Sequence, residues 1–191
     1  MSMSAHEPLG FHGKLPGVGD FVQRRLPASF VQPWDLHFAN CLDTVRQPLG
    51  QHWPGAYRNS GLRAFALGPG VCGAQAWAGM LGPGEDRVGR CFPLTVAMPL
   101  PHMCLPPAAW FGAVAACLGR SLRARTDAAG FDAALLALGV PAAPSSTYAP
   151  VHGESWWWRL GAAAQAMHGL PTAETYLDWL LAEQDITEVT R

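Results

Sequence analysis

Charged side chains are concentrated in the segment Asp86-Arg87-Val88-Gly89-Arg90. Asp, Glu, Lys and Arg make up only 14% of the chain, so such a dense group is informative. Arginine can bind a carboxylate or a phosphate through two parallel hydrogen bonds. Two readings stay open: a solvated turn between two strands, or a polar recognition surface carried by loops on a rigid sheet. The residues of this candidate interaction surface are Lys14, Asp20, Arg25, Asp86, Arg87 and Arg90.

An enzymatic alternative uses part of the same group. A small hydrolase or a phosphoryl-handling enzyme would need these side chains to meet in a concave site that holds a perturbed ionisable group. The residues that this alternative requires are Lys14, Asp20, Asp86 and Arg90.

Two glycine-rich stretches resemble nucleotide-binding loops but lack their defining residues. A Walker motif needs a glycine five residues before Gly13 and a hydroxyl residue after Lys14, and Pro8 and Leu15 stand there instead. The stretch 68–73 has the glycine spacing of a dinucleotide-binding loop, but the next glycines follow too soon for a crossover helix. We therefore predict a hairpin loop at 68–73 and no nucleotide cofactor.

The sequence also lacks the usual patterns of metal sites and hydrolases. It contains no G-x-S-x-G, no H-E-x-x-H and no Cys-x-x-Cys, which mark a nucleophile elbow and zinc sites. His102 and Cys104 are two residues apart, but two ligands do not make a closed zinc site. We predict no catalytic residues, no bound metal and no cofactor, and hence a protein that is not an enzyme.

Hydrophobic periodicity predicts the elements that must position these side chains. The clearest helix is expected over 28–47, where apolar residues recur at three- and four-residue steps: Phe30, Trp34, Phe38, Cys41 or Leu42, and Val45. Because proline is tolerated only in the first turn of a helix, we expect the regular helix to begin at Pro33, after an irregular lead-in over 26–32. Further helices are predicted from Pro107 to Leu122, over 127–138 and after Thr172. Strands are predicted at 9–15, 62–67, 75–81, 91–100 and 156–158, and a loop at 141–153.

The run Trp156-Trp157-Trp158 is the most aromatic point of the chain. Successive side chains of a strand point to opposite faces, so Trp157 should face one side of a sheet and its two neighbours the other. One face is expected to be buried. The other face must be covered by a helix or by a partner, because exposed aromatic patches mark interfaces.

Composition limits the broad class of the protein. A chain of 191 residues is long enough for one domain with a sizeable core. The net charge of −1 gives no electrostatic reason to expect nucleic acid as a partner. A basic cluster at Arg120, Arg123 and Arg125 falls where a helix should end, and cations interact favourably with the helix dipole there. We therefore interpret it as a structural feature.

The location expected from the sequence is the cytoplasm. We find no signal peptide and no apolar stretch long enough for a transmembrane helix. The five cysteines are odd in number and widely spread, which argues against a secreted disulfide framework. Residues 1–8 are expected to form a flexible tail, and residues 184–191 are expected to be frayed.

Several segments, taken together, resemble the TagF (ImpM) proteins associated with bacterial type VI secretion. The similar blocks, in chain order, are Gly13-Lys14-Leu15-Pro16, Gly19-Asp20-Phe21-Val22, Arg25-Leu26-Pro27, Pro33-Trp34, Arg63-Phe65-Leu67, Gly70-Val71-Cys72-Gly73, Trp77-Ala78-Gly79, Asp86 through Leu94, Ser155-Trp156-Trp157 and Gly169-Leu170-Pro171. Their order and spacing extend over nearly the whole chain.

This resemblance implies a fold and a role. The fold would be α/β (α+β): a single-domain sandwich over 1–191, with a mainly antiparallel central sheet flanked by helices, as in longin or profilin-like domains. The role would be post-translational regulation of type VI secretion, typically repression, through binding to components such as the forkhead-associated scaffold Fha. A structural subunit of the apparatus is a further alternative. The family offers no catalytic residues to carry over.

Overall fold

One seven-stranded sheet forms the centre of the molecule in the computed structural model, which describes residues 9–141 and 145–189. The strand order is β2-β1-β5-β4-β3-β6-β7, and each pairing between neighbours is antiparallel. The predicted fold class, an antiparallel central sheet flanked by helices, is confirmed. The strands are β1 (Gly10–Lys14), β2 (Phe21–Arg24), β3 (Arg63–Leu67), β4 (Trp77–Gly82), β5 (Leu94–Pro99), β6 (Glu154–Trp158) and β7 (Gln165–His168).

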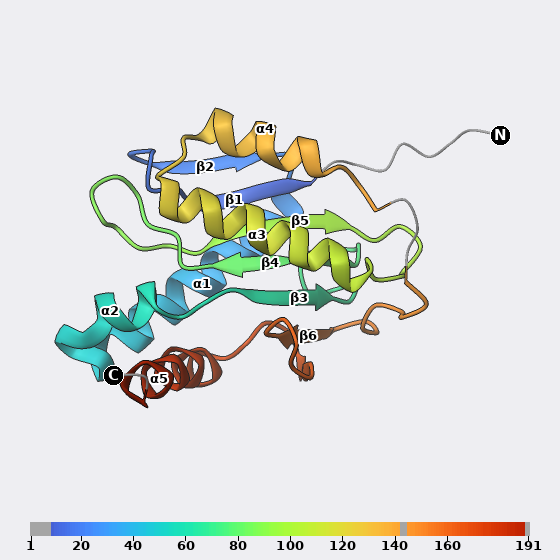
Figure 1. The fold of residues 1–191 in the computed structure, drawn as a ribbon. Helices are drawn as coiled ribbons and strands as arrows, with labels where there is room; N and C mark the ends of the chain where they lie inside the picture. The colour runs from blue at the N-terminus through green and yellow to red at the C-terminus, as the bar shows by residue number, and fades with distance from the viewer. Residues whose placement is uncertain (1–8, 142–144, 190–191) are drawn as a thin grey trace.

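Helices cover both faces of this sheet. Figure 1 shows α3 and α4 in front of the strands, α1 behind them, and α5 beside α2 near the C-terminus. No helix in the described part of the chain is long and apolar enough to cross a membrane. The helices are α1 (Ala28–Leu49), a short 3-10 helix η1 (Gly50–His52), α2 (Trp53–Arg58), α3 (Ala108–Ala124), α4 (Ala128–Leu138) and α5 (Ala173–Val189).

The sheet divides the apolar core into two clusters. Alternate residues of β3 face opposite sides: Ala64 belongs to the cluster under α3 and α4, and Phe65 to the cluster under α1, α2 and α5. The small residues of β3 therefore face α3 and α4, and its large residues face α1, α2 and α5. Trp157 is buried against Trp34 and Trp179, and Trp158 packs on Phe111 of α3. The predicted alternation of the tryptophan run is confirmed, and the chain's own helices contact both of its faces.

The predicted start of the first helix is wrong. We expected it at Pro33, but α1 already begins at Ala28. Proline at position 27 precedes the helix, and its carbonyl oxygen accepts hydrogen bonds from the backbone N–H groups of Phe30 and Val31, both at 3.0 Å. These bonds form the first turn, so Pro33 costs only one hydrogen bond near the helix start.

Four short elements were not predicted from the sequence: β2, β7, η1 and α2. The loop at 68–73 is confirmed as part of the hairpin connection between β3 and β4. Residues 145–153 of the predicted loop contain no regular element beyond an isolated bridge from Tyr148 to Cys104. The expected flexible tail at 1–8 lies outside the described residues. The expected fraying at 184–191 also lies mostly outside the described residues. Only the helical backbone of α5, as far as Val189, is described in that segment.

Candidate interaction surface

Asp86 organises a tight turn in the connection between β4 and β5. Its Oδ1 accepts hydrogen bonds from the backbone N–H groups of Val88 at 3.1 Å and Arg90 at 2.9 Å. The N–H of Gly89 donates to the carbonyl oxygen of Asp86 at 2.9 Å. An aspartate that accepts from backbone N–H groups a few residues further on favours turns for this reason. The local sequence therefore fixes the conformation of this loop.

Two cations converge on the other oxygen of the same carboxylate. Oδ2 of Asp86 lies 3.2 Å from Nζ of Lys14 and 2.6 Å from Nε of Arg90. Asp86 and Lys14 are only 1% and 7% exposed. Lys14 ends β1, and the loop can approach it because Gly84 has no side chain: a Cβ there would lie 2.5 Å from the Lys14 carbonyl oxygen. These ion pairs fasten the loop to the end of β1.

We call Lys14, Asp86 and Arg90 the Asp86 cluster. Burial alone would raise the pKa of the Asp86 carboxyl, but the hydrogen bonds from Arg90 and Lys14 outweigh burial and lower this pKa to about 2. The carboxylate is therefore ionised near neutral pH, whereas a general acid or base works best with a pKa near the working pH. Nζ of Lys14 also lies 5.0 Å from the centre of the Phe21 ring. This enclosed arrangement is suited to fastening a loop more than to transferring a proton or a phosphoryl group.

The fastened loop presents arginines to solvent. Nη2 of Arg90 donates to the carbonyl oxygen of Gly19 at 2.7 Å. The backbone N–H of Arg87 donates to the carbonyl oxygen of Val18 at 2.7 Å, while the Arg87 side chain is exposed. The loop is thus tied to the β1–β2 connection as well, and the guanidinium of Arg87 projects from a rigid base.

Three of the sequence-predicted site residues lie outside the Asp86 cluster: Arg87 beside it, Asp20 and Arg25. Asp20 is exposed, and its Oδ1 accepts a hydrogen bond from the N–H of Phe21 at 2.8 Å. Arg25 lies beyond the other end of β2, where its guanidinium forms an ion pair with Asp132 of α4 and donates to the carbonyl oxygen of Leu9. The structure therefore brings Lys14, Asp86 and Arg90 together beside Arg87, and it separates Arg25 from them.

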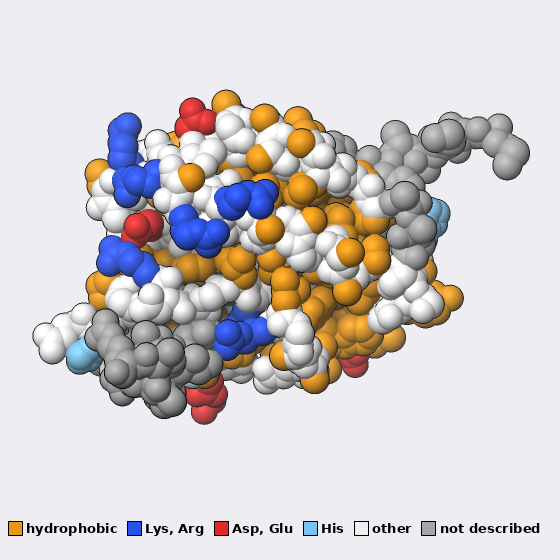
Figure 2. Space-filling view, in the orientation of Figure 1, with side chains coloured by type: hydrophobic (Ala, Val, Ile, Leu, Met, Phe, Trp, Pro, Cys, Tyr) orange, Lys and Arg blue, Asp and Glu red, His pale blue; other side chains and the backbone are white. Residues whose placement is uncertain are grey.

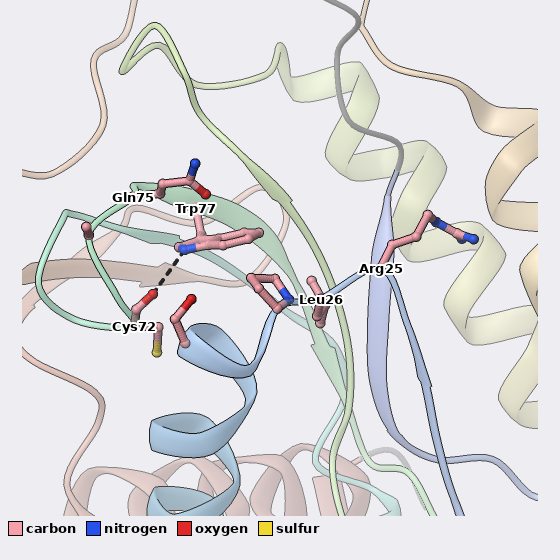
Figure 3. A pocket seen from close by; sticks show the side chains of 8 residues that line it. Arg25, Leu26, Cys72, Gln75 and Trp77 are labelled. Atoms are coloured by element: carbon pink, nitrogen blue, oxygen red, sulfur yellow. Dashed lines mark hydrogen bonds between the residues drawn. The ribbon is translucent and has the colours of Figure 1, made fainter.

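A large open groove at the start of α1 has a volume of about 890 Å³. Figure 3 shows the guanidinium of Arg25 pointing away from the other side chains that line this groove. Nε1 of Trp77 donates to the carbonyl oxygen of Cys72 at 3.1 Å. Burial raises the pKa of the Cys72 thiol to about 12, so it is not a thiolate nucleophile at neutral pH.

The pair His102 and Cys104 does not extend into a larger set of metal ligands. Among the side chains that the structure describes, within 9–141 and 145–182, no group of three or more from His, Cys, Asp or Glu is arranged to hold a metal ion. Cys104 forms the isolated bridge with Tyr148 described above.

Comparison with known proteins relates the whole chain to one family. Residues 10–138 match the model of the TagF N-terminal domain, which is type VI secretion system-associated. This chain belongs to the TagF family. The crystal structure of PA0076 from Pseudomonas aeruginosa PAO1 is similar to this chain, with a TM-score of 0.78 and 34% sequence identity. The match covers 90% of this chain and 93% of PA0076. Comparison with curated protein sequences gives no match. The resemblance to TagF proteins noted in the sequence is confirmed, as is an association with type VI secretion.

Part of the surface around the Asp86 cluster in this TagF domain was not predicted. Nε of Arg58 lies 2.9 Å from Oε2 of Glu85, beside a groove that reaches α3. Arg58 ends the short helix α2, which gives no periodic signal in the sequence. Arg120 and Arg123 do give a signal, because residues three apart share one face of a helix. From the sequence alone, that spacing indicated only a favourable helix end.

Proposed function

We propose that this protein restrains type VI secretion by binding another component of the apparatus, with the forkhead-associated scaffold Fha as the expected partner. The observation that carries this proposal is membership of a type VI secretion-associated family. The expected mechanism is occupation of a surface, without a chemical step. The predictions of no enzymatic activity and of a single domain over 1–191 remain predictions.

The geometry of the Asp86 cluster supports a binding role. A side chain that binds a partner loses less conformational freedom when its backbone is already fixed. Arg87 meets this condition, because its backbone is bonded to Val18 and its neighbour Asp86 is buried. Its guanidinium is exposed and can bind a carboxylate with two parallel hydrogen bonds.

Co-purification from bacterial cells that carry the secretion genes tests this proposal. We expect the tagged wild-type chain to retain a type VI secretion component, identified by mass spectrometry, with Fha among the retained proteins. The variant Arg87→Glu should retain several-fold less of this component. The matched control Arg24→Glu makes the same charge change on β2. The guanidinium of this exposed arginine donates to the carbonyl oxygen of its neighbour Gln23, and the variant should retain the wild-type amount.

Two results would contradict the proposal. Wild-type protein that retains no secretion component would remove the binding role. Secretion that is unaltered after deletion of the gene would remove the restraining role. A constant stoichiometric presence in the assembled apparatus would instead favour a structural subunit.

A further inference from the structure

A second groove, with a volume of about 330 Å³, lies close to the Asp86 cluster. It runs between the C-terminal turns of α3, the connection that leads into β3 and the loop that follows β4. Its lining combines Leu62, Leu122, Pro16 and Pro83 with the charged side chains at its edge. The groove is therefore apolar along its base and charged at its rim.

Glycines let the apolar side chains of this groove pack closely. A Cβ on Gly82 would lie 2.8 Å from Leu62 Cδ2 and 3.2 Å from Leu122 Cδ1, so these two leucines meet above a glycine. Gly119 of α3 faces the same space, where the nearest neighbours of an added Cβ would be Arg123 at 3.3 Å and Leu62 at 3.7 Å. Both leucines remain partly exposed. An apolar side chain from outside could contact both of them.

Arginines surround the groove in excess over carboxylates. Arg58 is paired with Glu85, and Arg90 with Asp86. Figure 2 shows the Lys and Arg side chains gathered over one half of this face, around the C-terminal part of α3 and the adjoining loops, with hydrophobic side chains between them. The exposed arginines of α3 and these loops that have no carboxylate partner among the described residues are Arg87, Arg120, Arg123 and Arg125.

These arginines form one continuous surface. Arg120 and Arg123 are three residues apart on α3 and share a helix face. Nη2 of Arg125 lies 3.5 Å from the carbonyl oxygen of Arg87, which links the end of α3 to the β4–β5 loop. Arg123 lines the groove itself. The cationic rim therefore extends from α3 across to the loop fastened by Asp86.

The composition of the groove distinguishes between two classes of anionic partner. A nucleic acid would present phosphates along its whole length, and binding would come from cations that neutralise them. This groove has an apolar base, which a sugar-phosphate backbone cannot complement. A protein segment that combines carboxylates with one large apolar side chain complements both parts of the site.

We propose that this groove binds an acidic segment of a protein partner, which packs one large apolar side chain against Leu62 and Leu122 and places carboxylates against Arg120 and Arg123. The inference rests on the proposed function, because the groove would be the docking site for the secretion component. It explains why the arginines at the end of α3 lack carboxylate partners among the described residues. Their position there contributes to helix stability as well.

Selection from a random peptide library displayed on phage tests the chemistry of the partner before its identity is established. We expect wild-type protein to enrich peptides that are rich in Asp and Glu and contain a Leu-like or aromatic residue. An enriched peptide, labelled with fluorescein, is then titrated by fluorescence polarisation. Its affinity should fall as salt rises, because exposed charges are screened over about 10 Å at 0.1 M salt.

Two pairs of variants separate the charge from the apolar contact. The double variant Arg120→Glu/Arg123→Glu should lower the affinity for the peptide by on the order of tenfold or more. The control Arg24→Glu should leave this affinity unchanged. Gly119→Leu fills the groove without a charge change and should also abolish binding. The matched control Gly112→Leu lies in the same helix, where no atom comes within 4 Å of an added Cβ, and should bind normally. Thermal unfolding of each variant verifies that it folds.

The proposal fails if no acidic peptide is enriched, or if the enriched peptide binds the double arginine variant as tightly as wild type. It also fails if a fluorescein-labelled oligonucleotide binds through these arginines with higher affinity than the peptide. The proposed function is judged separately by co-purification from cells. If the peptide binds in vitro but the protein retains no secretion component from cells, the groove remains a binding site and its role in type VI secretion is refuted.

Discussion

The carboxylate of Asp86 links a local turn to a long-range contact. One oxygen accepts two backbone N–H groups from its own loop, and the other meets Lys14, 72 positions earlier in the chain. A buried charge is tolerated when it is paired and hydrogen-bonded. Both conditions hold here, because the carboxylate lies between cations and N–H groups. Removing its charge would leave the ammonium of Lys14 buried without a counter-ion.

Asp86→Asn should therefore destabilise the fold strongly. We expect a loss of about 3 kcal/mol in the free energy of unfolding, as for other buried ion pairs that lose one partner. Urea denaturation followed by circular dichroism measures this loss. Asp43→Asn is the control, because its ion pair with Arg46 at 3.4 Å is largely exposed and surface pairs contribute about 0 to 1 kcal/mol. Equal effects of the two substitutions would contradict the structural role of Asp86.

The low pKa of Asp86 also predicts how stability changes with pH. The pKa is about 2 in the folded protein and about 3.9 in an unfolded chain. The unfolded state therefore binds the proton first as pH falls, so the contribution of Asp86 is complete above about pH 4 and is lost between about pH 4 and pH 2. The difference in unfolding free energy between wild type and Asp86→Asn should shrink over this window. Urea titrations at a series of pH values measure it, and a difference that stays constant would show that Asp86 is not ionised in the fold.

At the scale of elements, sequence patterns predicted the long helices and the strand packed on both faces, and they missed the short helices and strands. The periodicity of α1 and the alternation of β6 come from many buried residues, so each leaves a clear pattern. Strands β2 and β7 have four residues each, and Val22 is the only buried residue in either. One buried side chain defines no period. Helix α2 carries Pro54 and Gly55 near its start, which resemble turn residues.

The same limit applies to the candidate site. The charge density at 86–90 could be seen in the sequence, but the sequence left open whether this loop meets Lys14, which lies against Asp86 in the structure. The burial of Asp86 could not be seen, because it depends on contacts with β1. The partner of Arg25 is Asp132, 107 residues away on α4. No local pattern predicts such a pairing, since it follows from how α4 packs across the sheet.

At the scale of the whole molecule, the family model and the folded unit have different extents. The model ends at residue 138, yet the sheet continues into β6 and β7, and α5 covers the second core cluster. Trp157 contacts Trp34, Phe65 and Trp179 with ring centres 5.2 to 6.0 Å apart. The segment after residue 138 therefore completes a layer that begins with α1.

A chain that ends at residue 138 should consequently fail to fold alone. It would leave the apolar edge of β3 unpaired, and exposed hydrophobic edge strands favour aggregation. We expect this fragment to aggregate, to bind a hydrophobic dye and to lack a cooperative unfolding transition. Co-expression with residues 139–191 should restore a soluble complex with the near-UV circular dichroism of the intact chain, because β6 and α5 can return to β3 and α1. A monomeric fragment 1–138 that unfolds cooperatively and shows a native near-UV spectrum would mean that the α1 layer is stable without Trp157 and α5.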